Sequence, residues 1–218
     1  SFVQPFNITD GIELGKNNSL IIDGDSLVTG HDYMPLWFSG NESVSSSAVF
    51  AGYGFSIDEK ELKWNDYIGL DVVGKWVIVM RNGPERNNQH SLYTPHLGLH
   101  KKMLVARDKG ALGIIYVSQM EDTDLYPLKY IAGYSNAGIP AIHLSNEMAD
   151  ELFEAVGWTR KNIQKTMNQS LNTVSLKLPV TINASVDLNP IQTRAANVVG
   201  LIQSGNRKYR NEYVVIGA

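Results

Sequence analysis

The sequence contains no cysteine among its 218 residues. This absence excludes disulfide bonds, thiolate metal sites and a cysteine nucleophile. The sequence also has no excess of positive charge, because 19 lysines and arginines stand against 22 aspartates and glutamates and the formal net charge is -3. Without surplus cations to displace counterions from a phosphate backbone, nucleic acid is not an expected partner. The mean hydropathy of -0.17 likewise predicts no membrane span.

Common catalytic motifs are absent as well. The chain has neither a Gly-x-Ser-x-Gly nucleophile elbow nor a His-Glu-x-x-His zinc helix. Residues 69–75 have the glycine and lysine spacing of a phosphate loop, but Trp76 stands where a Ser or Thr would bind magnesium. An apolar run follows instead of a helix, so no helix terminus would face a phosphate. We therefore predict no catalytic residue and no metal ligand in this chain.

One alternative to that prediction stays open. His90, His96 and His100 are clustered, and the last two have the i, i+4 spacing of zinc ligands on one helical face. Pro95 and Gly98 argue against a regular helix there, and no glutamate lies between the two histidines to act as a base. Whether this group binds metal is not decided by the sequence.

The middle of the chain reads as strand, helix, strand. Residues 76–80 form a continuous apolar run that suits a central strand covered on both faces. Residues 98–109 have helical periodicity, with Lys102 and Asp108 expected to face water. Because a second apolar run at 112–117 follows after Gly110, the two strands are expected to be parallel neighbours.

The same alternation continues toward the carboxyl end. An apolar run at 140–144, in which His143 is expected to be structural, precedes a helix capped by Ser145, and another helix is expected after Thr159. Residues 174–186 alternate strictly, as a long half-exposed strand does, with Pro179 at an edge or bend. The first third of the chain is predicted to be mostly β.

Three segments in a fixed order carry a resemblance to a known family. These are Phe50-Ala51-Gly52-Tyr53-Gly54, Trp64-Asn65-Asp66-Tyr67 and Leu70-Asp71-Val72-Val73-Gly74-Lys75-Trp76-Val77, and residues 102, 106, 110–113 and 139–141 continue the pattern. Together they resemble the protease-associated (PA) domain of zinc aminopeptidases related to glutamate carboxypeptidase and the transferrin receptor. The resemblance implies an α/β fold, a β-rich swivelling β/β/α domain with short flanking helices and a terminal β-hairpin. We assign residues 1–190 to it, with flanking strands.

Residues 191–218 resemble the first strands of the family's peptidase domain. Segments 197–202 and 212–216 are expected to pair as the terminal hairpin. In the family a His-x-Asp zinc pair follows at once, whereas here the sequence stops at Ala218, and both of its ends look cut. The resemblance therefore implies a truncated peptidase start, no cofactor in this chain, and two zinc ions in the parent's peptidase domain. The chain alone is expected to be inactive.

The leading hypothesis is a non-catalytic lid that selects substrates or partners for an exported zinc aminopeptidase, which would be periplasmic, cell-surface or secreted. Its partners would be the peptidase domain of the same parent chain and peptide substrates. The alternative is a free-standing peptide- or protein-binding module. Within and beside the polar loop 82–95, Arg81, Arg86 and Tyr93 are candidate contacts with a peptide carboxylate or backbone. The same loop could also be a surface loop without a function.

Overall fold

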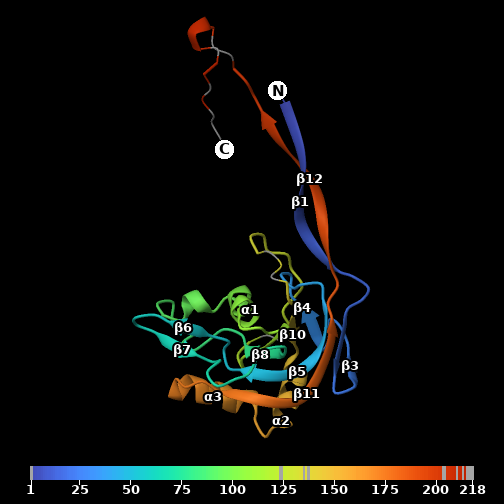
Figure 1. The fold of residues 1–218 in the computed structure, drawn as a ribbon, viewed down its shortest axis with the longest axis vertical. Helices are drawn as coiled ribbons and strands as arrows, with labels where there is room; N and C mark the ends of the chain where they lie inside the picture. The colour runs from blue at the N-terminus through green and yellow to red at the C-terminus, as the bar shows by residue number, and fades with distance from the viewer. Residues whose placement is uncertain are drawn as a thin grey trace.

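The computed structural model describes residues 2–122, 125–134, 136, 138–202, 205–209, 211–212 and 214. Its centre is an eight-stranded mixed sheet in the order β3-β2-β11-β5-β8-β9-β10-β4, in which β5, β8, β9 and β10 are parallel (Figure 1). Strands β6 and β7 form a separate hairpin, and β1 pairs with β12. The strands are β1 Phe2–Leu14, β2 Ser19–Ile22, β3 Asp25–Leu27, β4 Tyr33–Pro35, β5 Ser43–Ala51, β6 Ser56–Asp58, β7 Lys63–Asn65, β8 Trp76–Met80, β9 Gly113–Val117, β10 Ala141–Leu144, β11 Ser175–Ser185 and β12 Leu188–Val199.

Helices cover both faces of the sheet, which is why its central strands are continuous apolar runs. The helices are α1 Leu99–Asp108, α2 Asn146–Glu154 and α3 Arg160–Ser170, with short 3-10 turns η1 Thr94–His96 and η2 Arg207–Tyr209. Every residue of β8 is buried. Trp76, Ile78 and Met80 belong to the core shared with α2 and α3, whereas Val77 and Val79 belong to the core shared with α1. The predicted central strand and its parallel neighbour β9 are confirmed.

The helix boundaries follow from local chemistry. The side chains of Ser145 and Thr159 accept hydrogen bonds from backbone N–H groups in the first turns of α2 and α3, as helix-capping residues do. The helix expected after Thr159 is α3, and its Ile163 and Met167 are fully buried. Gly110, which follows α1, has φ +90°, a conformation that glycine adopts without steric cost.

Strand β11 is the long alternating strand that the sequence predicts. Its register with β5 shifts between Leu178 and Thr181, so Pro179 lies in an irregularity of the ladder. A proline has no N–H to donate and is tolerated at such a place. The predicted bend is therefore confirmed.

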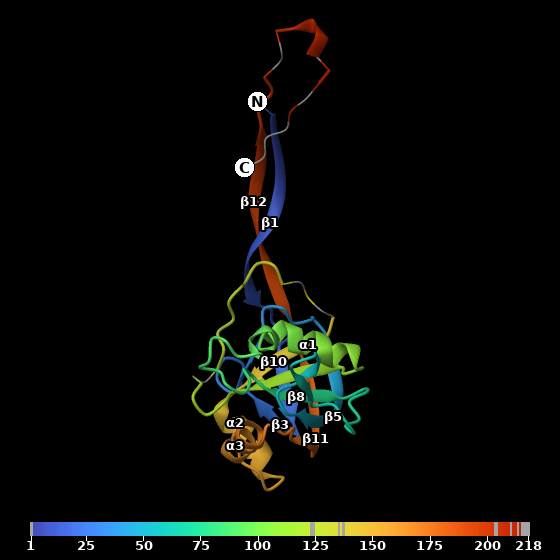
Figure 2. The same cartoon turned by 90° about the vertical axis from the view of Figure 1, so that its left-hand side faces the viewer.

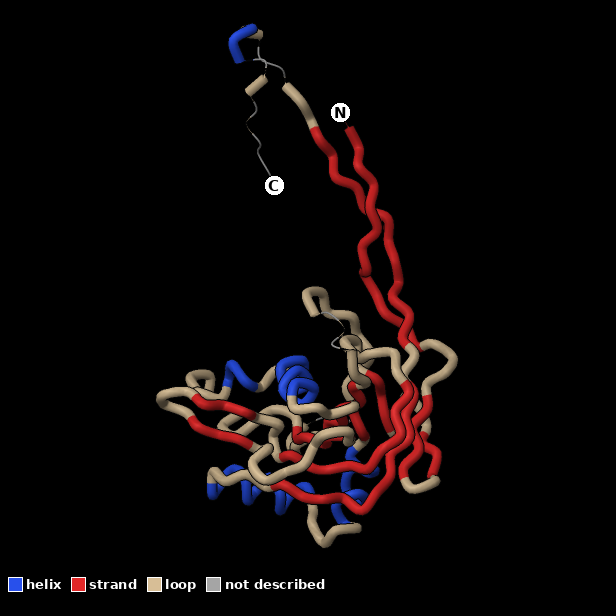
Figure 3. Tube along the Cα trace, in the orientation of Figure 1, coloured by secondary structure: helices blue, strands red, loops and turns tan. Residues whose placement is uncertain are grey.

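A two-stranded ribbon of β1 and β12 extends away from the sheet (Figures 2 and 3). Its antiparallel register runs from Phe2 opposite Val199 to Leu14 opposite Leu188. Residues 197–199, expected in the terminal hairpin, pair here with residues 2–4, while most of their expected partner segment 212–216 lies outside the described residues. The predicted domain division at residues 190 and 191 falls within β12 and stays a prediction.

The prediction that Lys102 faces water is wrong, although Asp108 is exposed as expected. Lys102 is only 1% exposed, and its Nζ donates to the backbone oxygens of Met80 at 2.9 Å and Asn82 at 2.5 Å. Burial lowers the pKa of Lys102 to about 7, against the opposing charge of Asp66. The amphipathic pattern failed because the carboxyl end of β8 presents carbonyl groups to this ammonium. Among the residues described, no helix is both long and apolar enough to cross a membrane.

Candidate functional site

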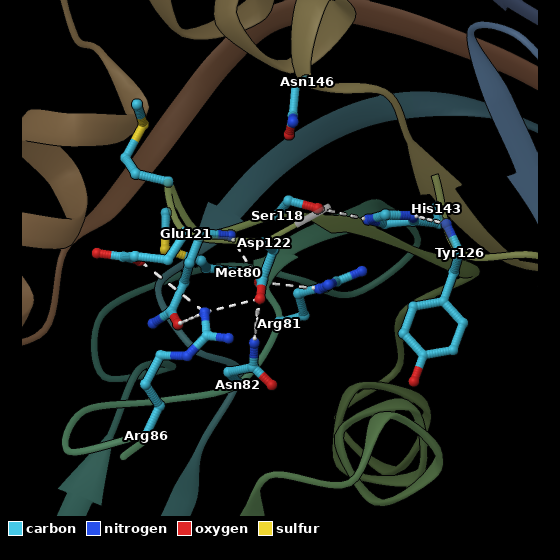
Figure 4. A network of polar contacts seen from close by, with 12 residues as sticks. Met80, Arg81, Asn82, Arg86, Ser118, Glu121, Asp122, Tyr126, His143 and Asn146 are labelled. Atoms are coloured by element: carbon cyan, nitrogen blue, oxygen red, sulfur yellow. Dashed lines mark hydrogen bonds and ion pairs between the residues drawn. The ribbon is translucent and has the colours of Figure 1, made fainter. Parts of the chain in front are cut away.

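A polar network surrounds the Asp122 carboxylate, which is 3% exposed (Figure 4). It accepts hydrogen bonds from Arg81 Nε at 3.0 Å, Asn82 Nδ2 at 2.8 Å and the backbone N–H of Gln119 at 3.1 Å. Arg86 Nη1 lies 2.7 Å from its other oxygen. Burial raises the pKa of Asp122, but hydrogen bonds and charge from Arg81, then from Arg86, outweigh burial and hold that pKa below its ordinary value. The carboxylate is therefore ionised at neutral pH.

The parallel sheet brings these residues together. Arg81 directly follows β8, and Asp122 lies in the connection that follows β9. Parallel strands end at the same edge of a sheet, and the Arg81 N–H extends the ladder by donating to the Val117 oxygen at 2.9 Å. Asp122 was missed at the sequence level. An arginine after one central strand and an acid after the next was the signal that could have found it.

The three candidate contact residues have different environments. Arg81 is buried, and Arg86 keeps part of its side chain accessible. Tyr93 lies in the aromatic core, stacked on Phe55 with ring centroids 6.0 Å apart and edge-on to Trp64 at 5.6 Å. The structure therefore brings the two arginines into one network and places Tyr93 elsewhere. Contact of any of the three with a peptide stays a prediction.

The clustered histidines do not converge. His96 is buried in η1, with Nε2 3.2 Å from a carboxylate oxygen of Glu59. His100 lies on α1 with its ring 5.4 Å from Phe38, and His90 is exposed. Within the described ranges, no group of three or more His, Asp or Glu side chains has a metal-binding arrangement. The alternative hypothesis of a zinc site at these histidines gains no support.

Ser118 and His143 form a buried hydroxyl–imidazole pair, with Oγ and Nε2 3.1 Å apart. The Tyr126 N–H donates to His143 Nδ1 at 2.8 Å, so Nδ1 is the acceptor and a neutral ring carries its proton on Nε2. Burial, followed by the charge of Arg81, lowers the pKa of His143 to about 3. A general base needs its Nε2 lone pair free toward the hydroxyl. The pair is therefore structural, in agreement with the prediction for His143.

A cavity of about 710 Å³ adjoins the network. We call it the aromatic cavity, because four rings line it together with the arginines. The rings are those of Trp37, His100, Tyr126 and Tyr134. Among the described residues, its lining includes the cations Arg81, Arg86 and Lys101 and the carboxylate of Asp122. An open cavity with apolar walls and a few convergent polar groups is the usual form of a ligand site.

The fold is a β-rich α/β domain whose central sheet has a parallel core of β5, β8, β9 and β10. A family model, that of the PA domain, matches residues 35–152. The match covers more than half of the 218 residues, and the chain belongs to the PA domain family. The predicted PA fold is thereby confirmed. A comparison with curated protein sequences gives no match.

Solved structures with a similar fold include peptidases. An aminopeptidase from Aneurinibacillus sp. strain AM-1 matches with a TM-score of 0.53 and 18% identity, over 95% of this chain and 39% of that protein. BSAP, a zinc aminopeptidase from Bacillus subtilis, matches with a TM-score of 0.49 and 15% identity, over 88% and 35% respectively. A peptidase M28 precursor from Shewanella amazonensis SB2B gives 0.46 and 16%, over 90% and 39%. The chain spans 35% to 39% of the length of these proteins.

Proposed function

We propose that this chain is a non-catalytic domain that covers the active site of an exported zinc aminopeptidase and selects its substrates or partners. One observation carries the proposal: 95% of the chain aligns within an aminopeptidase of which it spans only 39%. The PA family match over residues 35–152 supports the same assignment. The proposal includes the division into residues 1–190 and a peptidase start at 191–218. It also includes the kinship with the glutamate carboxypeptidase and transferrin receptor type.

The hydrolytic chemistry lies outside this chain in the proposal. A pair of zinc ions would supply an activated water in the peptidase domain. The described part of this chain offers no cluster of ligands for either ion. In this proposal the domain controls access to the active site and recognises substrates or partners, and bond cleavage takes place in the peptidase domain.

The ribbon of β1 and β12 supports a location beside a larger body. Its strands expose large apolar side chains, and a two-stranded ribbon alone is marginally stable in water. A packed neighbour would cover these side chains, and the peptidase domain of the same parent chain is the partner we propose. The exposed apolar side chains are Phe2, Val3, Phe6, Ile8, Leu14, Ile191, Val198 and Val199.

A deletion in the parent peptidase tests the lid role. Leu14 and Leu188 are opposite each other in the ribbon, so a short turn joining them would remove the globular part and retain the ribbon. We expect the shortened enzyme to hydrolyse a small chromogenic amino-acid amide as before and to lose its discrimination among longer peptides. The ratios of kcat/KM across a peptide panel measure this. Unchanged ratios would refute selection by this domain.

A free-standing peptide-binding module is the second candidate, and the aromatic cavity is the observation that favours it. Such a module would bind peptides without a peptidase domain. Calorimetric titration of the 218-residue chain with a peptide library, followed by the same titration in the parent, separates the two candidates. Binding that is equal in both would favour the independent module.

A further inference from the structure

An apolar groove lies between helix α2 and β3, which is the strand at one edge of the eight-stranded sheet. Its volume is about 220 Å³. Sites for whole small ligands have roughly 300–1,000 Å³, so this groove has room for a large side chain rather than for a complete ligand. The apolar residues that line it are Ile22, Leu27, Met148, Leu152, Ala155 and Val180.

The rim of this groove is acidic. Among the described residues, its lining holds the carboxylates of Asp23, Asp25 and Glu151 and no lysine, arginine or histidine. Asp23 is held in place, because its Oδ1 accepts a hydrogen bond from the Thr181 N–H at 2.7 Å. Asp25 and Glu151 are exposed. A rim with charges of one sign beside apolar walls attracts a cationic ligand.

Strand β3 also offers an open backbone edge. It pairs with β2 on one side, with Leu20 opposite Leu27, and on its other side no strand of the described chain pairs with it. Side chains alternate along a strand, and accordingly Asp25 and Leu27 line the groove whereas Ser26 does not. An extended peptide can add to such an edge, with backbone hydrogen bonds for affinity and alternate side chains in a pocket for specificity.

Charge decides which chain fits this edge. A second copy of this protein, paired edge to edge, would bring the two acidic rims together. Like charges that face each other across a strand pair are destabilising, and charged edge strands protect sheets from such pairing. A segment that carries lysine or arginine is attracted by the same rim. The occupant is therefore a basic segment of another protein and not a second copy.

We propose that the groove between β3 and α2 docks an extended, basic segment of a partner protein by strand addition to β3. A large apolar side chain of the added strand lies beside Leu27 in the groove, and a Lys or Arg two residues away lies beside Asp25. This spacing follows from the alternation of side chains along a strand. Helix α2 lies at the end of the molecule opposite the tip of the ribbon (Figures 1 and 2). The inference goes beyond the proposed function and does not depend on it.

Three heptapeptides, each acetylated and amidated, test the proposal by calorimetry on the 218-residue chain. The first, Thr-Val-Thr-Phe-Thr-Lys-Thr, places its apolar and cationic side chains on one face of a strand. The second has Glu in place of Lys, and the third, Thr-Val-Thr-Phe-Lys-Thr-Thr, moves Lys to the other face. We expect the first to bind at least about tenfold more tightly than the other two, and its affinity to fall as salt is raised. Equal affinity of all three, or no binding at millimolar concentration, would overturn the proposal.

Matched variants locate the peptide in the groove. Glu151→Gln and Glu154→Gln remove the same charge from exposed positions of α2, but only Glu151 lines the groove. The former should weaken the first peptide about threefold and the latter should leave its affinity nearly unchanged. Ala155→Phe fills the groove from an exposed position and should weaken binding at least about tenfold, with an unchanged unfolding midpoint. Full affinity in Ala155→Phe would contradict docking in the groove.

Two further measurements test the mode of binding and the other occupant. In NMR titration with the first peptide, the backbone amides of residues 25–27 should shift, because a strand added to β3 hydrogen-bonds to its backbone. Shifts confined to α2 would overturn strand addition. Sedimentation equilibrium without peptide should show no dimer that Ala155→Phe dissociates. Such a dimer would assign the groove to a second copy and reject the basic partner.

Discussion

Replacing Asp122 with asparagine keeps the size of the side chain and removes the charge that two guanidinium groups share. The Asp122 side chain is 3% exposed, and the Arg81 side chain is 9% exposed. The variant would leave Arg81 as a buried cation without a counter-charge, and Arg86 would lose its nearest carboxylate oxygen, at 2.7 Å. Removing one partner of a buried ion pair costs about 3–5 kcal/mol of unfolding free energy. Asp122→Asn is therefore expected to be destabilised by about that amount.

Urea unfolding followed by tryptophan fluorescence measures this loss. For a chain of this size about 1 kcal/mol corresponds to about 2–4 °C in Tm, so the Tm should fall by about 6–20 °C. Asp58→Asn is the matched control, because Asp58 also pairs with a cation, Lys63, at 2.6 Å but is 85% exposed. Exposed pairs are screened by water, and the control midpoint should not change measurably.

The pH dependence of the stability difference between the natural protein and Asp122→Asn is a second check on Asp122. Its pKa in the folded protein lies below the ordinary value of 3.8. The stability from this carboxylate is therefore fully present above about pH 4 and lost as the pH falls through the lower folded value. The gap between the natural protein and Asp122→Asn should shrink in acid. Equal stability at pH 7, or a gap that widens on acidification, would refute the buried ion pair as its source.

Three further substitutions probe buried groups, each followed by urea unfolding. Burial raises the pKa of Asp66 to about 7. The stability from this carboxyl group is therefore present below about pH 4 and lost as the pH rises through 7. Asp66→Asn should flatten this decline of unfolding free energy with pH, and an unchanged decline would contradict Asp66 as its source. Gly113→Ala would place a Cβ 2.3 Å from the Trp76 ring and should cost about 1–3 kcal/mol, whereas Gly98→Ala meets nothing within 4 Å and should be nearly neutral. Lys102→Met leaves two backbone carbonyls without their donor and should cost about 1.5–3 kcal/mol, a loss that a water-facing lysine would not produce.

Local patterns predicted the centre of the fold because a strand that is buried on both faces is a continuous run of apolar residues in the sequence. The residues of β8 and β9 are all buried, and both runs were recognised as strands. Lys102 was misplaced because helical periodicity assigns charged residues to water and holds no information about carbonyl groups on a neighbouring strand. Pairing of β1 with β12 was missed for a related reason, since it joins residues 2–14 to residues 188–199, far apart in the sequence, and has no local signal.

The candidate site was predicted in part. Arg81 and Arg86 were selected as cations in and beside a polar loop, and the structure places both at Asp122. Trp37 and Tyr126 were not selected, because each lies in a connection far along the chain from that loop and an aromatic residue alone gives no sign of lining a cavity. Tyr93 was selected because it lies in the polar loop 82–95, but its ring packs against Phe55. Topology, which decides these neighbours, is a non-local property.

The register of the ribbon also determines how the domain would respond to mechanical force. Phe2 and Val199 are opposite each other at the far tip, so a pull that separates them acts across the ladder and not along it. The rungs between β1 and β12 would then open one after another, in the manner of a zipper, each at low force. The load would reach the eight-stranded sheet only after the pair formed by Leu14 and Leu188 had opened. The ribbon would thus lengthen under load before any force reached the globular part.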